Sequence, residues 1–554
     1  MARIQKTVAI LLPIFLIGCA SSKPQAFVVD TPAQIFTDMG PHVRAVTTSS
    51  PEAQDYFNQG LNWLYSFNHD EAIRSFKKAA ELDPTCAMAW WGVSYCEGPN
   101  YNDPVMTEER SLAAWDALQK ALANIDHVTP VERDLIEALE ARYVNPWPED
   151  RTELNKAFGD AMANVWADHP NDSDVGTLYA DSLMVQRPWM LYELDFTPAE
   201  DTPKIESVLE QVMAMDPTNP GAKHLYIHTV EPSGTPDRGI PAANALGDLV
   251  PASGHLRHMP AHIYVKTGLW HRAVEQSVKA MAADDAYQEL SPKQSIQWLY
   301  MVHNSHMMAF AAMMTGREEE AMAAARDMWN DISEDDLKRV GPIFDFWMCS
   351  VFDVQKRFGR WDAIIAEPAP PEYLPITHAT WRAARAVAYA AKKDFKNAER
   401  EYKKFKKCRS QVPADAHWGG PDLADRVLEV ADYFIAGEIA LQHGEWDKAA
   451  ELLEKGADVE DTLSYGEPPQ WLQPIRHTIG AVYMKSGKFA EAERVYREDL
   501  SKWRENGWSL WGLMQALNAQ GKSAEAAKVK ARFDKIWQFA DAPIDSSCKC
   551  ISGI

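Results

Sequence analysis

The stretch Tyr56–Pro84, YFNQGLNWLYSFNHDEAIRSFKKAAELDP, contains the pattern that decides the fold. Small and apolar residues recur three or four positions apart in both of its halves: Gly60, Leu61, Leu64, Tyr65, Ala72, Phe76, Ala79 and Ala80. This spacing places them on one face of a helix, so the stretch predicts two amphipathic helices joined by a short turn. Because Pro84 cannot continue a helix, we expect the second helix to end near Asp83.

The turn between those two helices has counterparts along much of the chain. Each begins with a glycine, or once with a lysine, and precedes a helix with an alanine-rich face: Gly268-Leu269-Trp270, Gly316-Arg317-Glu318, Gly359-Arg360-Trp361, Lys393-Asp394-Phe395, Gly444-Glu445-Trp446, Gly487-Lys488-Phe489 and Gly521-Lys522-Ser523. Repetition of one helix–turn–helix unit is typical of a solenoid, and we expect roughly nine or ten helical pairs between about residues 50 and 538.

This pattern resembles the tetratricopeptide repeat (TPR), in which small and large apolar positions interlock two antiparallel helices. The resemblance covers most of the chain and is specific in the first, the ninth and the last pairs, but it is degenerate between residues 100 and 260. It implies an all-α, right-handed α-solenoid whose concave face is lined mainly by the first helix of each pair.

Bulk composition narrows the classes of function. The 554 residues carry a formal net charge of −23, which argues against a nucleic-acid partner because phosphate binding needs a basic surface. The same charge argues against binding to an anionic lipid surface. Beyond the N-terminal segment no apolar run reaches about 18 residues, so we expect no internal membrane span.

The N-terminal segment has the features of an export signal. Arg3 and Lys6 precede an apolar run from Val8 to Ile17. The residues that follow, Leu16-Ile17-Gly18-Cys19, resemble a bacterial lipobox, in which the cysteine is lipidated. The resemblance implies a protein of the cell envelope that contacts the membrane only through its lipid anchor and is held at the outer membrane facing the periplasm. The alternative is an ordinary signal peptide in which Cys19 occurs by chance.

These features divide the chain into six segments. We expect residues 1–18 to be the signal peptide, 19–48 the lipidated cysteine and tether, 49–215 the N-terminal repeats, 216–330 histidine-rich repeats, 331–540 the C-terminal repeats and 541–554 a tail.

Histidines concentrate in the second group of repeats, residues 216–330. Eight of the sixteen fall between residues 224 and 306. If Gly234, Gly268 and Gly316 each end the first helix of a pair, most of them stand thirteen, ten or six residues before one of these glycines: His224, His228, His255, His258, His262, His303 and His306. Such offsets form a single stripe on one helix face. Neighbouring helix axes lie about 8–10 Å apart, so imidazoles from adjacent helices can reach a shared point. The alternative is that these imidazoles are satisfied core residues.

This stripe predicts a metal site on the concave face. Glu231 adds a carboxylate one turn beyond His228. We expect a divalent ion, zinc or iron in preference to copper, bound by His224, His228, Glu231, His258, His262, His303 and His306. Glu231 is also the candidate catalytic base, although it follows the second histidine, unlike the acid of the zinc-protease helix. His255 is the weakest member of the stripe.

Four strings carry a second resemblance: HLYIHTVEP (224–232), GHLRHMPAHIY (254–264), FNHDEA (67–72) and AMAWWG (87–92). They are similar to a group of bacterial TPR proteins of unassigned function, with a match from about residue 50 to 310. The resemblance implies a shared site and names no reaction.

Aromatic residues indicate a possible ligand surface. Trp90, Trp91 and Tyr101 cluster after one helix, and Trp189 lies in a separate loop. In a concave groove such rings can stack on a small molecule or a peptide; the alternative is that they fill gaps between repeats.

Three classes of function remain open. The first is a metal-dependent enzyme, either a hydrolase or an oxidoreductase. The second is a non-catalytic TPR scaffold for protein–protein interaction in the periplasm, and the third is metal storage or delivery. A TPR fold by itself favours a binding module only by analogy.

Overall fold

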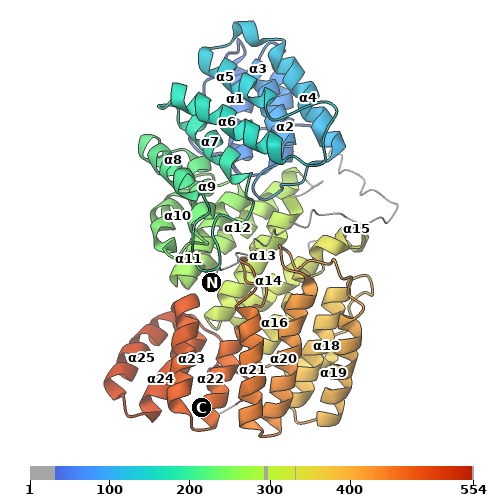
Figure 1. Cartoon of the computed structure of the whole chain (residues 1–554), viewed down its shortest axis with the longest axis vertical. Coiled ribbons are helices and arrows are strands. Elements are labelled where there is room, and N and C mark those ends of the chain that lie inside the picture. Colours follow the sequence, from blue (N-terminus) through green and yellow to red (C-terminus); the bar gives the residue numbers. More distant parts are fainter. Residues whose placement is uncertain (1–31, 292–296, 331, 552–554) are drawn as a thin grey trace, which may run out of the picture.

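The computed structural model describes residues 32–291, 297–330 and 332–551. These residues form 25 α-helices and three 3-10 helices, and within them β-structure is limited to two isolated bridges. Successive helices pack against one another from α1 at one end of the long axis to α25 at the other (Figure 1). The predicted all-α, TPR-like solenoid is confirmed.

The helices of the first half are α1 (Pro51–Tyr65), α2 (His69–Leu82), α3 (Ala87–Glu97), α4 (Glu108–Leu122), η1 (Ile125–His127), α5 (Pro130–Glu140), α6 (Thr152–Asp168), α7 (Ser173–Met184), α8 (Thr202–Met215), α9 (Pro220–Val230), η2 (Pro236–Gly239), α10 (Ile240–Leu246), α11 (Gly254–Thr267) and α12 (Trp270–Leu290). Those of the second half are α13 (Gln297–Met314), α14 (Glu318–Asn330), α15 (Glu334–Phe344), η3 (Trp347–Cys349), α16 (Ser350–Arg357), α17 (Trp361–Ala366), α18 (Pro375–Ala391), α19 (Phe395–Arg409), α20 (Ala424–Gln442), α21 (Trp446–Glu460), α22 (Ile475–Lys485), α23 (Phe489–Lys502), α24 (Gly507–Ala519) and α25 (Ser523–Trp537).

Within the described ranges the helices group into twelve consecutive pairs, with α15 standing outside them. This is more than the roughly nine or ten pairs expected from repeat counting. The additional pairs lie among α3 to α10, where the sequence repeat is degenerate. Helices there keep the paired packing although their turns have lost the glycine signature, because apolar faces still have to be covered.

In the first pair, the predicted helices are fixed by caps and by one aromatic ring. The Ser50 side chain accepts from the Ala53 amide at the start of α1, and Asn68 accepts from the Glu71 amide at the start of α2. The Phe76 ring of α2 lies between two glycines. A Cβ atom at Gly60 or Gly92 would lie 2.7 or 2.6 Å from that ring, which is closer than side-chain packing allows.

The pair α22 and α23 repeats this arrangement near the other end of the chain. The Tyr496 ring of α23 lies between Gly480 of α22 and Gly512 of α24, and a Cβ atom at either glycine would overlap the ring. One aromatic residue on the second helix of a pair therefore packs between glycines of the preceding and following helices in both regions.

Most of the turn glycines have the left-handed backbone that the repeat predicts: Gly268, Gly316, Gly359, Gly444, Gly487 and Gly521 all have φ between +69° and +79°. Lys393 takes the same conformation, with φ of +60°. Gly234 does not, so its use as the end of a helix is wrong. Glu231 is the C-cap of α9, and a 3-10 helix follows instead of a glycine turn.

The ends of the described chain are packed, which corrects two expectations. Residues 32–48 were predicted to belong to a tether, but His42 hydrogen-bonds Asp174 on α7 at 2.8 Å and Phe36 is buried. Residues 541–551 were predicted to be a tail, but Cys548 is fully buried among the last repeats. Residues 1–31, with the signal segment and Cys19, lie outside the described residues.

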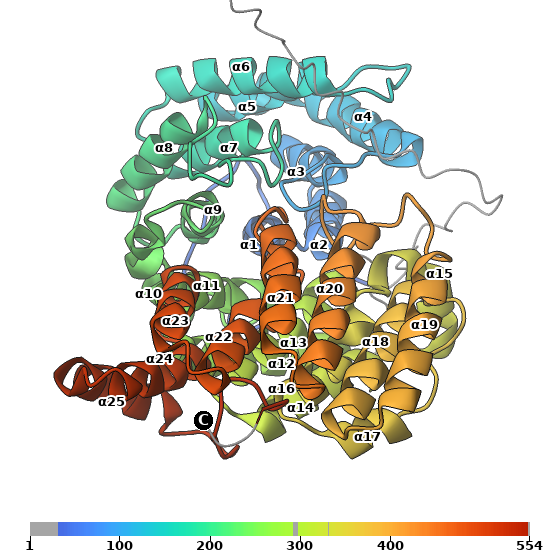
Figure 2. The same cartoon turned by 60° about the horizontal axis from the view of Figure 1, so that its bottom comes forward.

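The last repeats fold back onto the middle of the solenoid. The indole nitrogen of Trp508 on α24 donates to the Met313 carbonyl at the end of α13, at 2.7 Å. That of Trp270 on α12 donates to the Arg504 carbonyl at 2.8 Å. Both views place α23 next to α11 (Figures 1 and 2). No helix among the described residues is long and apolar enough to cross a membrane.

Replacing Gly480 with alanine tests the ring-and-glycine packing. The added methyl group would overlap the Tyr496 ring, so we expect the free energy of unfolding of the C-terminal repeats to fall by about 1–3 kcal/mol. Urea unfolding followed by tryptophan fluorescence measures the change. Gly420→Ala is the control, since a Cβ atom there meets nothing within 4 Å among the described residues. Equal stability of the two variants would contradict the packing argument.

Replacing Asp174 with asparagine tests the anchoring of residues 32–48. Burial raises the pKa of Asp174, but hydrogen bonding and charge from His42 and the charge of Arg44 outweigh it and hold the pKa at about 2. The carboxylate therefore stabilises the fold at neutral pH, and this contribution is lost as the pH falls from about 4 to about 2. Asp174→Asn should cost about 3–5 kcal/mol and expose the segment to protease.

Limited proteolysis at neutral pH measures that exposure. Asp160→Asn, which removes an exposed ion pair with Lys156, is the control and should leave the cleavage rate unchanged. Protection of residues 32–48 in Asp174→Asn equal to that in the unaltered chain would refute the anchor.

Candidate metal centre

Three neighbouring helices bring six histidines together in the interior. Helix α9 carries His224 and His228, α11 carries His255, His258 and His262, and α13 carries His303. All are buried except His303, which is partly exposed. We call these six residues, with Glu231 and Glu467, the histidine cluster. Its ligand atoms form overlapping groups of three in which all atoms lie within 4.8 Å of one another.

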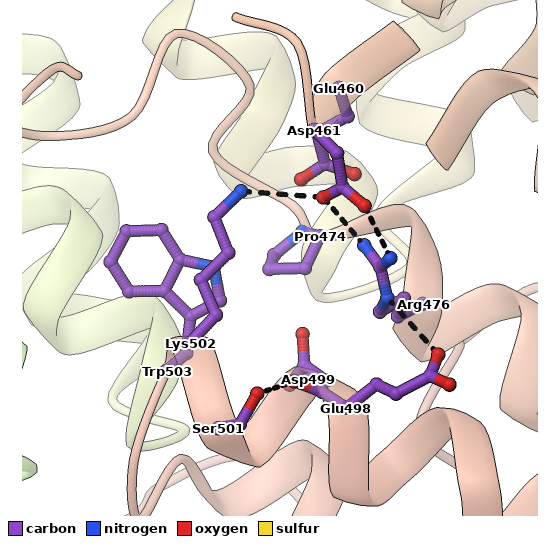
Figure 3. Close-up of a pocket in the computed structure, with 9 residues that line it drawn as sticks. All are labelled: Glu460, Asp461, Pro474, Arg476, Glu498, Asp499, Ser501, Lys502 and Trp503. Atoms are coloured by element: carbon purple, nitrogen blue, oxygen red, sulfur yellow. Dashed lines mark hydrogen bonds and ion pairs between the residues drawn. The ribbon is translucent and has the colours of Figure 1, made fainter. Parts of the chain in front are cut away.

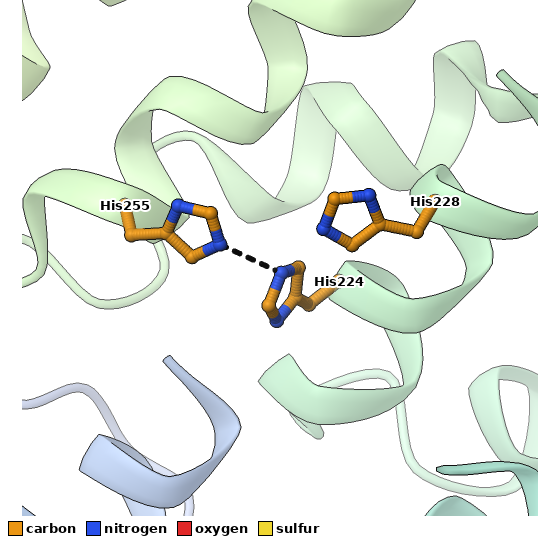
Figure 4. Close-up of side chains that lie close together, drawn as sticks. All are labelled: His224, His228 and His255. Atoms are coloured by element: carbon orange, nitrogen blue, oxygen red, sulfur yellow. Dashed lines mark hydrogen bonds between the residues drawn. The ribbon is translucent and has the colours of Figure 1, made fainter. Parts of the chain in front are cut away.

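The first group consists of His224, His228 and His255 (Figure 4). His224 donates from Nδ1 to the Tyr65 carbonyl at 2.7 Å, which fixes its ring and leaves Nε2 as the free nitrogen. Gly221 makes this contact possible, because a Cβ atom there would overlap the Tyr65 ring. The Nε2 atom of His255 then lies 3.0 Å from Nε2 of His224.

The second group consists of His258, His262 and His303. The Nε2 atoms of His258 and His262 lie 2.5 Å apart, and those of His303 and His262 lie 3.3 Å apart. His258 and His262 are one turn apart on α11, so both rings leave the same helix face, and α13 supplies the third ring from the side.

Glu231 joins the two groups. One carboxylate oxygen lies 3.0 Å from Nδ1 of His228 and the other lies 2.8 Å from Nδ1 of His262. A carboxylate in this position accepts a hydrogen bond from the Nδ1–H group of each ring. The Nε2 lone pair of each ring then points away from the carboxylate. Since both oxygens are engaged, the geometry makes Glu231 an orienting residue of the cluster and leaves it poorly placed to act as the base that the sequence suggested.

Glu467 is a member of the cluster that the sequence did not reveal. It lies in the loop between α21 and α22, its side chain is 2% exposed, and its carboxylate pairs with Nδ1 of His262. More than 200 residues separate it from the helix it contacts. The only local signal is a charged residue before Pro468 and Pro469, which does not distinguish a buried ligand from an ordinary loop residue.

Burial and the two carboxylates set the protonation of the rings. Burial, followed by the charges of neighbouring imidazoles, lowers the pKa of four rings well below the usual value: His224, His255, His258 and His303. The pKa of His228 is lowered to about 3 by the same causes. Neutral imidazoles are the form that binds a metal.

His262 behaves differently because it faces two carboxylates. Burial alone would lower its pKa, but Glu467 and then Glu231 raise it to about 10. Burial, followed by the charge of Glu231, raises the pKa of Glu467 to about 7. The centre of the cluster therefore concentrates negative charge, which a bound cation or a protonated His262 has to offset.

Several buried ring nitrogens lack hydrogen-bond partners among the described residues: Nε2 of His228 and the Nδ1 atoms of His255 and His258. An unpaired buried polar atom is costly. Zinc–nitrogen bonds of about 2.0–2.1 Å place neighbouring ligand nitrogens about 3.3 Å apart, close to the 3.0 and 3.3 Å separations of the His224–His255 and His262–His303 pairs. The His258–His262 pair, at 2.5 Å, has to open by about 0.8 Å to share one ion.

Aromatic rings enclose the cluster. Phe67, whose φ is +56°, lies 4.4 Å from the His224 ring, and Tyr300 lies 4.4 Å from the His255 ring. Tyr101 and Trp189 lie 5.3 and 5.9 Å from the His228 ring and stack on each other. These contacts exclude water from the first group of histidines.

Other predicted residues lie apart from the cluster. His306 is buried on α13, but its ring contacts Phe346 and it belongs to none of the three-ligand groups. Trp91 donates to the Leu135 carbonyl, and Trp90 stacks under Lys120, so neither contacts the histidines. Conversely, His255, the weakest member of the predicted stripe, is in the first group.

A cleft lies apart from the histidine cluster, in the C-terminal repeats (Figure 3). It has a volume of about 240 Å³ and its lining includes no histidine. Its charges are largely paired: Arg476 and Lys502 both contact Asp461, and Arg476 also contacts Glu498. The chemistry of the histidine cluster therefore does not depend on this cleft.

Comparison with known proteins agrees with the repeat assignment. Residues 53–86 and residues 477–507 each match the tetratricopeptide repeat family, which confirms the predicted TPR resemblance at these two segments. No curated protein matches the chain.

Two solved structures match most of the chain, at low sequence identity and low structural similarity. The human IFIT1 dimer with m7Gppp-AAAA is 14% identical, and the match covers 89% of this chain and 91% of that chain with a TM-score of 0.31. The APC/C hetero-tetramer Cut9-Hcn1 is 12% identical, with 87% and 76% covered and a TM-score of 0.29. At such scores the fold assignment rests on the helical pairs described above.

Replacing Glu467 with glutamine tests the contact between the two halves of the chain. The amide keeps the shape but loses the charge that faces His262, so we expect a loss of about 1–3 kcal/mol and faster amide exchange in residues 461–474. Hydrogen exchange with mass spectrometry measures it. Glu445→Gln removes an exposed pair with Lys448 in the same repeat and should change nothing. Unchanged exchange in Glu467→Gln would show that the contact does not hold the loop.

Proposed function

We propose that this protein is a TPR solenoid that binds transition-metal ions in its interior. Two ion positions are available, one formed by His224, His228 and His255 and the other by His258, His262 and His303. The observation that carries the proposal is the convergence of three ring nitrogens at each position, together with the unpartnered Nε2 of His228.

The choice of metal follows from the donor atoms. Each position offers three imidazoles, with carboxylates close by. This set suits zinc or iron, whereas copper favours sites rich in thioethers. Three protein nitrogens leave one position of a tetrahedral ion for another ligand, and a metal in such a site can activate a bound water.

The chain's own residues act here by holding the donors. Tyr65 and Glu231 fix the rings through Nδ1, Phe67 and Tyr101 exclude water, and Glu467 adds negative charge from the far side. Because the carboxylate of Glu231 is engaged on both sides, it is not free to abstract a proton from a substrate. This supports metal binding, storage or delivery ahead of hydrolysis with Glu231 as base.

A second candidate function is a scaffold for a protein partner. It is supported by the two tetratricopeptide repeat matches, since such repeats commonly form binding surfaces. A peptide or small molecule in the concave groove remains compatible with the metal centre, and the net charge of −23 disfavours nucleic acid.

On the sequence of residues 1–19 we further propose a lipid anchor at Cys19 and a place at the outer membrane facing the periplasm.

Elemental analysis of the full chain, purified without a histidine tag, tests the metal proposal. We expect the histidine cluster to account for close to two zinc or iron ions per chain. His255→Gln should remove one ion by disabling the first position, and His303→Gln should remove one by disabling the second. His306→Gln is the matched control, because His306 is a buried histidine on the same helix as His303 but outside both positions.

Two outcomes would overturn the proposal. The first is a metal-free chain that takes up none of zinc, iron, manganese or copper when these are added. The second is metal that persists at full amount in both the His255→Gln and the His303→Gln variants. Circular dichroism of each variant establishes that any loss of metal is not a loss of helix.

A further inference from the structure

A second set of metal-type ligands lies far from the histidine cluster. Residues 541–551 run back into the solenoid after α25, and they bring Cys548 and Cys550 to Glu438 on α20. The ligand atoms of these three residues lie within 4.8 Å of one another, and the Cys548 sulfur is 3.7 Å from one Glu438 oxygen.

Several hydrogen bonds hold this segment in place. Arg357 donates to the Ser547 carbonyl. The Ser547 hydroxyl lies 2.8 Å from the His477 carbonyl and 2.7 Å from the Tyr496 hydroxyl. Gln442 donates to the Cys550 carbonyl at 2.8 Å. These partners come from α16, α20, α22 and α23, so the cysteines are positioned by four helices of the solenoid.

The buried carboxylate of Glu438 is only partly satisfied by hydrogen bonds from the described residues. The residue is 1% exposed, and its Oε2 atom has no hydrogen-bond partner among the described residues. A buried carboxylate without a partner is costly, so a ligand that engages this oxygen would stabilise the site. The orphaned oxygen belongs to the same carboxylate that faces the Cys548 sulfur.

The surrounding charges match a divalent cation. With both thiols deprotonated, the two sulfurs and the carboxylate carry three negative charges, which a divalent ion and the buried guanidinium of Arg357 together offset. Lys356 is already paired with Asp353 at 2.8 Å. Arg357 is 1% exposed, and its Nη1 and Nη2 contacts are with uncharged groups, the His477 ring and the Ser547 carbonyl.

We propose that Cys548, Cys550 and Glu438 form a second, independent metal site that takes zinc. Two thiolate sulfurs and one carboxylate oxygen are ligands that zinc accepts, and the fourth position of a tetrahedral ion is left for water. Binding displaces the two thiol protons to solvent, and no bond to carbon changes. The site shares no ligand with the histidine cluster, so either can exist without the other.

Cobalt(II) substitution distinguishes this site from the histidine cluster. A thiolate-bound cobalt ion has a sulfur-to-metal charge-transfer absorption in the near ultraviolet, whereas an ion held by imidazoles and carboxylates has none. The full chain, stripped of metal and kept reduced so that a Cys548–Cys550 disulfide cannot form, is titrated with cobalt(II). We expect the thiolate absorption to reach the intensity of one thiolate-bound cobalt ion per chain, in addition to any cobalt that the histidine cluster binds.

Matched variants assign the absorption. Cys550→Ser should abolish it, and Glu438→Gln should weaken cobalt affinity by about tenfold or more. Cys408→Ser, which alters a partly exposed cysteine on α19 outside the site, should leave it unchanged. Cys550 is itself only partly buried, so its serine variant should keep the fold, which circular dichroism checks.

The proposal fails if the reduced chain gives no thiolate absorption with cobalt(II). It also fails if the absorption persists at full strength in both Cys548→Ser and Cys550→Ser. Loss of the absorption in Cys408→Ser alone would assign the thiolate ligand to a different part of the molecule and overturn the site.

Discussion

Close approach of neighbouring helices at glycine positions is the constraint on which the rest of this structure depends. Gly60 and Gly92 admit the Phe76 ring between two helices, and Gly221 admits the Tyr65 ring against α9. The second contact brings the Tyr65 carbonyl within 2.7 Å of the His224 ring. The packing rule that builds the solenoid therefore also selects the ring orientation at the candidate metal centre, since only a small residue lets a backbone carbonyl come so near.

The histidine cluster shows how a packed interior can hold so many polar groups. Each imidazole must satisfy two nitrogens, and the helices supply partners for only some of them. Glu231 satisfies Nδ1 of both His228 and His262, but Nε2 of His228 stays without a partner among the described residues. A solenoid core made only of apolar side chains would avoid this cost, so the cluster is better explained by a ligand than by stability.

Local periodicity accounts for what the sequence could predict. The helical pairs, the left-handed turn glycines and the stripe of histidines all follow from spacings within one or two repeats. The prediction that Gly234 ends a helix is wrong for a local reason as well. Helix α9 ends at its C-cap Glu231 without a glycine turn, so Gly234 does not mark the end of a helix. His306 stands at the same offset from a turn glycine as the other members of the stripe, but its ring faces Phe346. Glu467, and Glu438 as the partner of the C-terminal cysteines, could not be found this way, because contacts between distant repeats bring these residues to their partners.

Both candidate metal sites depend on contacts between repeats that are distant in the sequence. The loop that carries Glu467 reaches His262 only because the last repeats fold back onto α11 to α13, through Trp270 and Trp508. The segment that carries Cys548 likewise reaches Glu438 only because residues of α16, α20, α22 and α23 hydrogen-bond to it. In a repeat protein most contacts are between neighbours, so ligands drawn from distant repeats are the exception. An ion at either position would link segments that neighbour packing alone does not hold together, and its binding energy would add to the stability of the closed superhelix.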